Sequence, residues 1–340
     1  MSVRQERIRV NDALAKRMRA ARHRRAASPT ATPTSLPTET RAGIAARYPG
    51  DKNIGSDPDV ILADDFEDYT SPDKLKGKWD GVYRLTNLRI DTETFYSGGK
   101  SLEMQLPVST REISNALVKN LSPEQDTVFL RCYTRFDPDY NVVPTSTHNG
   151  IRLSAHYPGP GIKPNQDGTG FFLFLLQNSI RRKALAGERI PGYSHLYVYW
   201  PEQRMAFGDH WYPDGTIKPG GKGIGNKGEW LAYSDQYPDF KPMPHFLPKL
   251  DQWYCYELMV RANTPGKSDG EVKYWVDGKL VSAFPNLNLR SISKLKMDQA
   301  KIGLHAKHSE RVNKKWYDNV VIATKYIGPV AVGVSGSAPN

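Results

Sequence analysis

The sequence predicts an all-β fold, built as an antiparallel β-sandwich. Short segments in which polar and apolar residues alternate recur along the chain, and turn-forming residues separate them. In addition, no long helical pattern follows residue 27. Strands that succeed one another without crossover helices pair antiparallel, and this many strands form two packed sheets. The 340 residues are enough for one large sandwich with a substantial core.

The alternation gives the strands in order along the chain. Asp277 and Gly278 stand between two of them and predict a tight hairpin turn, because Asp-Gly accepts positive φ angles. Two longer segments, 157–170 and 201–249, are rich in Gly, Pro, Asp and aromatic residues. Long loops on a rigid scaffold commonly carry function, so we expect them to wall a cleft. The clearest strand segments are residues 60–66, 82–90, 101–106, 127–136, 170–176, 195–200, 253–260, 271–281, 301–308 and 315–324.

The sandwich domain is expected to span residues 45–329. Residues 1–27 form a basic extension with a helical pattern, and residues 28–44 form a linker rich in Ser, Thr and Pro. Residues 330–340 have the composition of a flexible tail.

Most of the net charge of +11 belongs to the extension, because residues 1–26 hold nine Lys or Arg against two acidic residues. Such an arm suits an anionic surface, but a solvated extension is the simpler interpretation, and nucleic acid is not an expected partner. No apolar run reaches the length that spans a bilayer, and the N-terminal segment lacks the apolar stretch of a secretory signal. Cys132 and Cys255 are expected as buried free thiols, with a bridge between neighbouring strands as the alternative.

Alternation also sorts side chains onto the two faces of each strand. Several strands carry a polar, aromatic and basic stripe opposite an apolar one. The mixture of Tyr, His, Arg and Trp favours a ligand cleft over a plain solvated face, which is the alternative. The stripes are Arg131, Tyr133 and Arg135; His195, Tyr197 and Tyr199; Glu257 and Arg261; Glu271, Lys273 and Trp275; and Lys301, His305 and Lys307.

Four segments carry a resemblance to a known family: HNGIRL (148–153), LYVYWPEQ (196–203), residues 253–281 and WYDNVVIATKYIGP (316–329). The chain resembles the concanavalin A-like jelly-roll polysaccharide lyases of the alginate and glucuronan lyase type, and related uncharacterised jelly-roll proteins. The resemblance covers most of residues 45–329. It implies a jelly roll, a uronate-containing polysaccharide as substrate and partner, cleavage by β-elimination, and a place outside the cell.

The resemblance also implies roles for particular residues. Such lyases line their groove with a basic residue and a Tyr-x-Tyr pair, which Tyr197 and Tyr199 match, and His148 stands near the family's lysine-containing, glycine-rich segment. The Ser-x-Arg of the preceding family strand has no counterpart in TGFFLFLL (169–176), so Arg152, or Arg131 and Arg135, are expected to supply its charge. The alternative for each Tyr is cross-strand packing.

We expect His148 or Tyr199 as the base and Tyr197 as the proton donor. Arg152, Arg135 and Asn149 are expected to bind the carboxylate, since charge that develops beside it needs cations or donors. The full set expected at the substrate is Asn149, Arg152, Arg131, Arg135, His195, Glu257, Lys273 and Trp275.

A structural Ca²⁺ site is a further hypothesis, and no cofactor is expected for the chemistry. The first and last strands often pair in such sandwiches, which would bring ADDFED (63–68) beside YDN (317–319) and offer oxygen ligands from Asp64, Asp65, Glu67 and Asp318. Solvated carboxylates are the alternative.

Other functions remain open at this stage. No paired-carboxylate signature of glycosidases, nucleophile elbow, P-loop or Rossmann glycine pattern occurs. A non-catalytic carbohydrate-binding module, and a structural protein docked through its basic arm, are the alternatives to a lyase.

Overall fold

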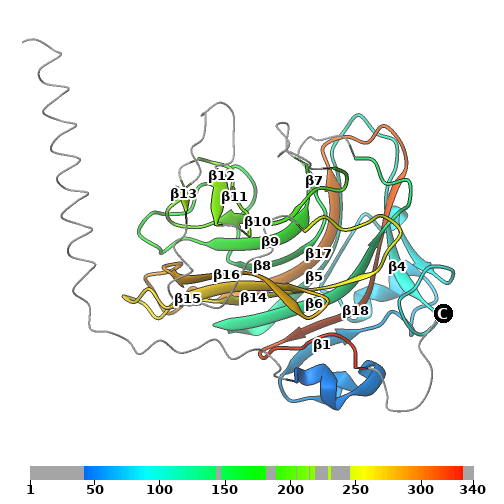
Figure 1. Cartoon of the computed structure of the whole chain (residues 1–340), viewed down its shortest axis with the longest axis horizontal. Coiled ribbons are helices and arrows are strands. Elements are labelled where there is room, and N and C mark those ends of the chain that lie inside the picture. Colours follow the sequence, from blue (N-terminus) through cyan, green and yellow to red (C-terminus); the bar gives the residue numbers. More distant parts are fainter. Residues whose placement is uncertain are drawn as a thin grey trace, which may run out of the picture. The chain divides into compact units, whose positions relative to one another are not determined.

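The computed structural model describes residues 42–142, 147–180, 189–203, 205–213, 215–218, 229–230 and 246–331. The basic extension expected at residues 1–27, most of the linker at 28–44 and most of the tail at 330–340 lie outside these residues. Within them, two large antiparallel sheets pack against each other (Figure 1), which confirms the predicted all-β sandwich.

One sheet has eight strands and is called the eight-stranded sheet below. Off the main path of this sheet β1 pairs with β18, and the first and last strands therefore meet as predicted. Its strands, in spatial order, are β16 (Lys279–Leu287), β15 (Gly270–Val276), β14 (Tyr254–Arg261), β6 (Thr127–Phe136), β18 (Asn313–Ala323), β4 (Ser101–Leu106) and β3 (Leu88–Asp91), with β1 (Val60–Asp64) beside β18.

The other sheet is called the ten-stranded sheet. Its strands, in spatial order, are β13 (Glu229–Trp230), β12 (Thr216–Lys218), β11 (Asp209–Trp211), β10 (Ser194–Tyr199), β9 (Phe172–Asn178), β8 (Ile151–Ala155), β17 (Met297–Ala306), β5 (Ile113–Gln125) and β2 (Gly81–Tyr83), with β7 (Thr147–His148) beside β17. The short 3₁₀ helices are η1 (Ile44–Arg47), η2 (Pro49–Asp51), η3 (Ile54–Ser56), η4 (Pro72–Gly77) and η5 (Leu85–Asn87). No helix among the described residues has the length and apolar character needed to cross a membrane.

The core lies between the two sheets, where the apolar side of each strand points. Leu153, Phe174 and Ile302 contribute from the ten-stranded sheet, and Leu130 and Leu258 contribute from the eight-stranded sheet. All of these side chains are buried. The period-two pattern of the sequence therefore leaves the opposite side of each sheet for polar and aromatic residues.

Local details of the prediction also hold. Asp277 and Gly278 have φ angles of 50° and 74°, and they join β15 to β16 in the predicted hairpin. Cys132 and Cys255 are both buried and free.

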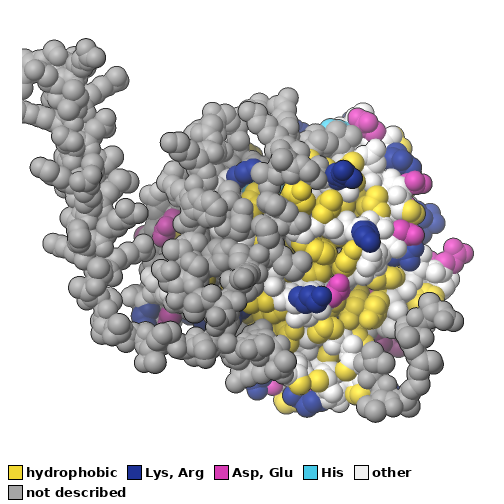
Figure 2. Space-filling model, in the orientation of Figure 1, with side chains coloured by type: hydrophobic (Ala, Val, Ile, Leu, Met, Phe, Trp, Pro, Cys, Tyr) yellow, Lys and Arg dark blue, Asp and Glu magenta, His cyan; other side chains and the backbone are white. Residues whose placement is uncertain are grey.

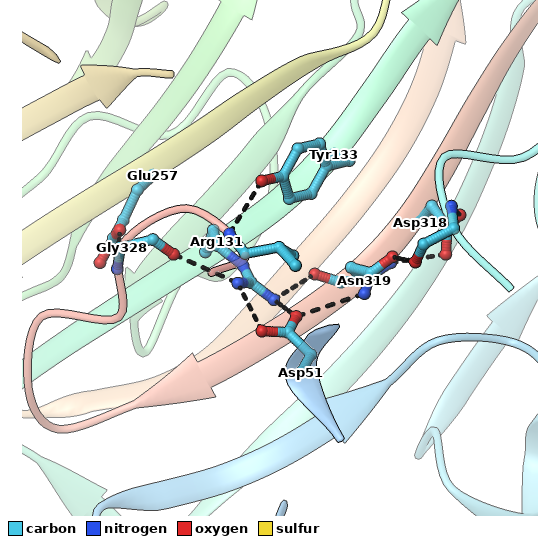
Figure 3. Close-up of polar contacts among 9 residues, drawn as sticks. Asp51, Arg131, Tyr133, Glu257, Asp318, Asn319 and Gly328 are labelled. Carbon is cyan, nitrogen blue, oxygen red and sulfur yellow. Dashed lines mark hydrogen bonds and ion pairs between the residues drawn. The ribbon is translucent and has the colours of Figure 1, made fainter. Parts of the chain in front are cut away.

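The outward face of the eight-stranded sheet is covered by segments near the two ends of the described chain (Figure 3). Arg131 on β6 is completely buried there and pairs with Asp51 of η2. Its guanidinium also donates to the main-chain oxygens of Asn319 at 3.0 Å and Gly328 at 3.2 Å. Glu257 on β14 accepts from the main-chain N–H of Gly328 at 2.9 Å. These bonds hold the N-terminal 3₁₀ segment and the C-terminal segment against the sheet.

We predict that Asp51→Ala lowers the free energy of unfolding by about 3–5 kcal/mol, because it leaves the Arg131 guanidinium buried without its counter-ion. Urea unfolding followed by tryptophan fluorescence measures this. The matched control is Asp139→Ala, which removes an exposed ion pair to Arg311 and should change stability by less than about 1 kcal/mol. Equal effects of the two substitutions would contradict the role given to Asp51.

Candidate functional site

A cavity of about 600 Å³ lies on the outward face of the ten-stranded sheet. Four residues that were given a role from the sequence line it: His148, Arg152, Tyr197 and Tyr199. The segment 157–170 contributes Tyr157 to its wall and the segment 201–249 contributes Phe207, so parts of both long segments border the cleft as predicted. On the face that Figure 2 shows, Lys and Arg side chains are scattered among apolar ones.

Strand register explains why these residues meet. Tyr197 on β10 pairs with Leu175 on β9, and Leu175 pairs with Arg152 on β8. Arg152 pairs in turn with Lys301 on β17. Residues paired across a sheet point to the same face, with strands about 4.8 Å apart. A single leucine therefore separates the tyrosine from two adjacent cations.

Arg152 and Lys301 are half-buried cations, and no ion pair joins either of them to a carboxylate among the described residues. Arg152 donates to the side chain of Gln299, and its guanidinium lies over the ring of Tyr157, 5.4 Å from the centroid. Its Nε atom is buried and has no hydrogen-bond partner. Burial lowers the pKa of Lys301 to about 7 and that of Arg152 to about 10. Burying such charges is unfavourable unless an anion compensates them, which favours an anionic ligand here.

The two tyrosines form a hydroxyl pair. Their oxygens lie 3.2 Å apart, and the main-chain N–H of Gly208 donates to the Tyr197 oxygen at 3.0 Å. Burial raises the pKa of Tyr197, so its phenol stays protonated at neutral pH. With its oxygen already accepting from Gly208, the Tyr197 hydroxyl can donate its proton to Tyr199 or to a ligand.

A chain of hydrogen bonds fixes the tautomer of His148. The Nδ1 atom of His195 lies 2.9 Å from the carbonyl oxygen of Tyr193, so this nitrogen donates. Because an amide nitrogen can only donate, the Nε2 atom of His195 accepts from Gln177 Nε2 at 3.1 Å; His210 Nδ1 also lies 2.9 Å from it. The remaining Gln177 atom, Oε1, accepts from His148 Nδ1 at 2.8 Å. We therefore assign the proton of His148 to Nδ1 and its lone pair to Nε2.

His148 is held as a neutral imidazole. Burial and the neighbouring His305, whose ring stacks at 5.3 Å, lower its pKa to about 3. No hydrogen bond to its Nε2 atom occurs among the described residues. The ring reaches this position because Gly150 lets the chain pass close to β9: a Cβ atom there would lie 1.8 Å from the carbonyl oxygen of Leu176. His148 thus offers an unprotonated nitrogen beside Tyr197, whose ring centroid is 4.6 Å away.

Two expected ligand-binding residues lie behind the cavity. The Asn149 side chain is buried, donates to the carbonyl oxygen of Asn178 and accepts from the main-chain N–H of Asn178 at 2.9 Å. It therefore anchors the segment that carries His148. His195 is buried as well and contacts His148 through Gln177.

Five expected substrate residues lie on the other sheet, which corrects the expectation that they share the cleft. Arg131 and Glu257 hold the chain ends, and Arg135 pairs with Asp251. Lys273 pairs with Glu271, and Trp275 packs against Tyr326 at 5.2 Å. Alternation predicts which face of a strand each side chain occupies, but it does not predict which of the two sheets the strand joins.

Other cavity residues had no role assigned from the sequence. Lys301 and His305 were visible as one stripe, but their pairing with β8 and β7 depends on long-range register. Gln177 follows an apolar run in the sequence, and its importance appears only through His148 and His195. Glu112 pairs with His305 at 3.1 Å, and no sequence pattern pointed to it.

The carboxylates expected to bind Ca²⁺ belong to separate hydrogen-bond networks. Asp64 accepts from Tyr69 at 2.9 Å and Trp79 at 2.6 Å. Asp65 accepts from a main-chain N–H at 3.3 Å, and Glu67 accepts from two at 2.8 Å each. Asp318 accepts from the N–H groups of residues 96, 97 and 319. Among the described residues, no three His, Cys, Asp or Glu side chains converge as a metal site.

No protein-family model matches the sequence, and no curated protein matches it. Solved structures do match the fold. A double mutant of alginate lyase Aly36B in complex with alginate trisaccharide gives a TM-score of 0.53, at 13% identity over 77% of this chain and 97% of that chain. Alginate lyase vAL-1 from Chlorella virus gives 0.51, at 12% identity over 78% of this chain and 99% of that chain. The chain therefore shares the jelly-roll fold of alginate lyases, as its sequence resemblance predicts.

We predict that His148 is observed as the neutral Nδ1–H tautomer between about pH 5 and 8. Long-range ¹⁵N–¹H NMR of the histidine rings measures this, with the exposed His156 as internal comparison. Because the folded pKa is near 3 and the ordinary value is 6.5, His148 also makes stability fall as the pH drops below about 6.5. An Nε2–H tautomer would show that the lone pair does not face the cavity.

Proposed function

We propose that the protein is a polysaccharide lyase that cleaves an anionic, uronate-containing polysaccharide by β-elimination. The observation that carries this proposal is the pair of half-buried cations, Arg152 and Lys301, beside the Tyr197–Tyr199 hydroxyl pair. The shared fold with an alginate lyase that holds alginate trisaccharide supports it. Because the substrate is a polymer, we place the activity outside the cell.

The chemistry sets three demands. A base removes the proton on C5 of the uronate, and the electron pair of that C–H bond forms the C4–C5 double bond. The bond from C4 to the glycosidic oxygen breaks, and that oxygen needs a proton. Negative charge develops on the C6 carboxylate in the transition state, and preorganised cations stabilise it.

Arg152 and Lys301 meet the third demand by binding the carboxylate. Both are partly shielded from solvent, so their attraction for the developing charge is stronger than it would be in water. A neutralised carboxylate makes the neighbouring C5 proton more acidic. This proposal keeps Arg152 in its expected role as a carboxylate binder. In the same role, Lys301 replaces Arg135 and Asn149.

His148 is the base in this proposal, through its Nε2 lone pair. Burial lowers its pKa to about 3, and a bound carboxylate raises this pKa because negative charge favours the imidazolium. Tyr197 is the proton donor to the leaving oxygen, and its hydroxyl contact with Tyr199 offers a path for the proton's replacement.

The carboxylates of the cavity argue against hydrolysis. Glycoside hydrolysis ordinarily uses two carboxylic groups on either side of the scissile bond. Glu112 is the only acidic residue among the described residues that line the cavity, and it pairs with His305. A lyase needs no second carboxylate.

We predict that Tyr197→Phe combined with Tyr199→Phe lowers kcat on the substrate polymer by about 10²–10⁴-fold, because general-acid catalysis contributes roughly this much. The assay follows the ultraviolet absorbance of the unsaturated uronate with alginate, glucuronan, pectate and glycosaminoglycans. Unchanged circular dichroism and melting temperature exclude unfolding. Full activity of the double variant would overturn the assignment, and no product from any polymer with the wild-type protein would favour a binding module.

We predict that kcat/KM falls as the pH rises through about 7, because Lys301 binds the carboxylate only while it is protonated. Lys301→Arg keeps the charge and should move this fall to higher pH. Rate measurements from about pH 5 to 10 test both statements. An increase of kcat/KM through pH 7 would show instead that neutral Lys301 is the base.

A further inference from the structure

Small residues form a trench in the outward face of the ten-stranded sheet. Tyr83 on β2 pairs with Ala116 on β5, and Ala116 pairs with Gly303 on β17. The N–H of Gly303 donates to the carbonyl oxygen of Gly150 at 3.0 Å, next to β8. Between Tyr83 and the His148 segment, this row therefore holds only Ala, Gly and Gly.

Larger side chains flank the row on both sides. Lys301 and its partner Val118 stand two residues along the strands in one direction, and His305 and its partner Ser114 stand two residues along in the other. Side chains two residues apart in a strand share a face. The floor of the trench thus runs across the strands, with a cationic wall on one side.

A second cavity of about 500 Å³ continues the first along this trench. Its lining includes Ser114, Arg152, Tyr157 and Lys301, which also line the first cavity, so the two meet at the cation pair. At its far end the lining is Tyr83 together with the next residue, Arg84.

Tyr83 has the properties of a stacking platform for a sugar ring. It is 55% exposed, one of the most exposed large aromatic side chains in the described chain. Its ring is supported from below by Gly81, where a Cβ atom would lie 2.8 Å from the ring. The ring therefore lies over the backbone instead of extending freely into solvent.

Arg84 has an unusual backbone conformation, and its side chain makes no polar contact with the described residues. Its φ and ψ angles are 62° and 54°, in the left-handed region that non-glycine residues rarely adopt. Consecutive residues of a regular strand point to opposite faces, but this conformation ends β2 and lets Tyr83 and Arg84 line the same cavity. No hydrogen bond or ion pair reaches the exposed Arg84 guanidinium from the described residues. Backbone strain of this kind is frequent at functional sites.

We infer that Tyr83 and Arg84 form a second subsite, which binds another acidic sugar of the same polymer chain at the far end of the trench. The inference rests on the proposed function and specifies its substrate as an oligomer of several uronates. From β8 to β2 there are three inter-strand steps, or about 14 Å, which exceeds the width of one pyranose ring. Tyr83 supplies the stacking surface and Arg84 the charge for the second carboxylate.

The test compares oligosaccharides of two lengths. The variant is Tyr83→Ala combined with Arg84→Asn, since Asn tolerates the left-handed conformation. It is placed in the Tyr197→Phe, Tyr199→Phe background so that bound sugars are not consumed. The matched control in the same background is Phe95→Ala combined with Lys267→Asn, which removes an aromatic and a cation that do not line either cavity. Calorimetry measures Kd for the disaccharide and hexasaccharide of alginate, glucuronan and pectate.

For the hexasaccharide that binds best, we expect Kd to rise at least about tenfold in the Tyr83, Arg84 variant, as the loss of one charge-assisted contact predicts. The disaccharide Kd and both Kd values of the control should change less than about twofold. An unchanged hexasaccharide Kd, an equal loss for both lengths, or no binding of any acidic oligosaccharide would overturn the subsite.

The same substitutions in the otherwise wild-type chain separate this inference from the proposed function. If the hexasaccharide binds through Tyr83 and Arg84 but no unsaturated product forms, the subsite stands and the lyase proposal fails. If product forms at equal kcat/KM from long and short substrates in both proteins, the lyase proposal stands and the subsite is wrong.

Discussion

The ion pair between Arg131 and Asp51 holds both ends of the described chain against one side of the sandwich. A fully buried guanidinium needs a counter-ion and acceptors, and here they come from η2 and from the chain near Asn319 and Gly328 (Figure 3). Around it, Ile44, Ile54 and Ile327 form a small apolar cluster with Val321 and Ala323 of β18. The outward face of the eight-stranded sheet is therefore committed in part to holding the chain's ends. Both cavities described above lie on the outward face of the ten-stranded sheet.

Two arginines in similar sequence settings differ in how their charge is compensated, and this difference distinguishes a structural role from a functional one. Arg131 and Arg152 both stand on the outward, polar side of a strand; Arg131 is fully buried and Arg152 is half-buried. Arg131 has a carboxylate partner, whereas Arg152 has an amide, an aromatic ring and a second cation as neighbours. The charge of Arg131 is therefore compensated without a ligand. The arrangement at Arg152 leaves two charges poorly compensated, and the free energy that this costs the folded protein is recovered when an anion binds.

The sequence predicts the strands, their faces and part of the site, because these depend on local alternation. It brought out His148, Tyr197, Tyr199 and Arg152, which the structure gathers around one cavity. It could not place Glu257 or Lys273, since the choice between two sheets is set by pairing between distant segments. It also missed Gln177, whose side chain matters only because His148 and His195 lie on either side of it. Asn149 turns inward because the chain passes irregularly from β7 to β8, where simple alternation does not apply.

The trench joins two ends with different physical properties. At the end near β10 the groups are buried, and their interactions with charge that develops during the reaction are strong because water is excluded. At the β2 end Tyr83 and Arg84 are exposed, so their contacts with a sugar are screened and act alike on the ground state and the transition state. Binding at the exposed end therefore raises the occupancy of the cleft and orients the polymer, while the buried end lowers the barrier. A sheet this wide allows both tasks on one rigid surface, because the reacting bond and the holding contact lie several strands apart.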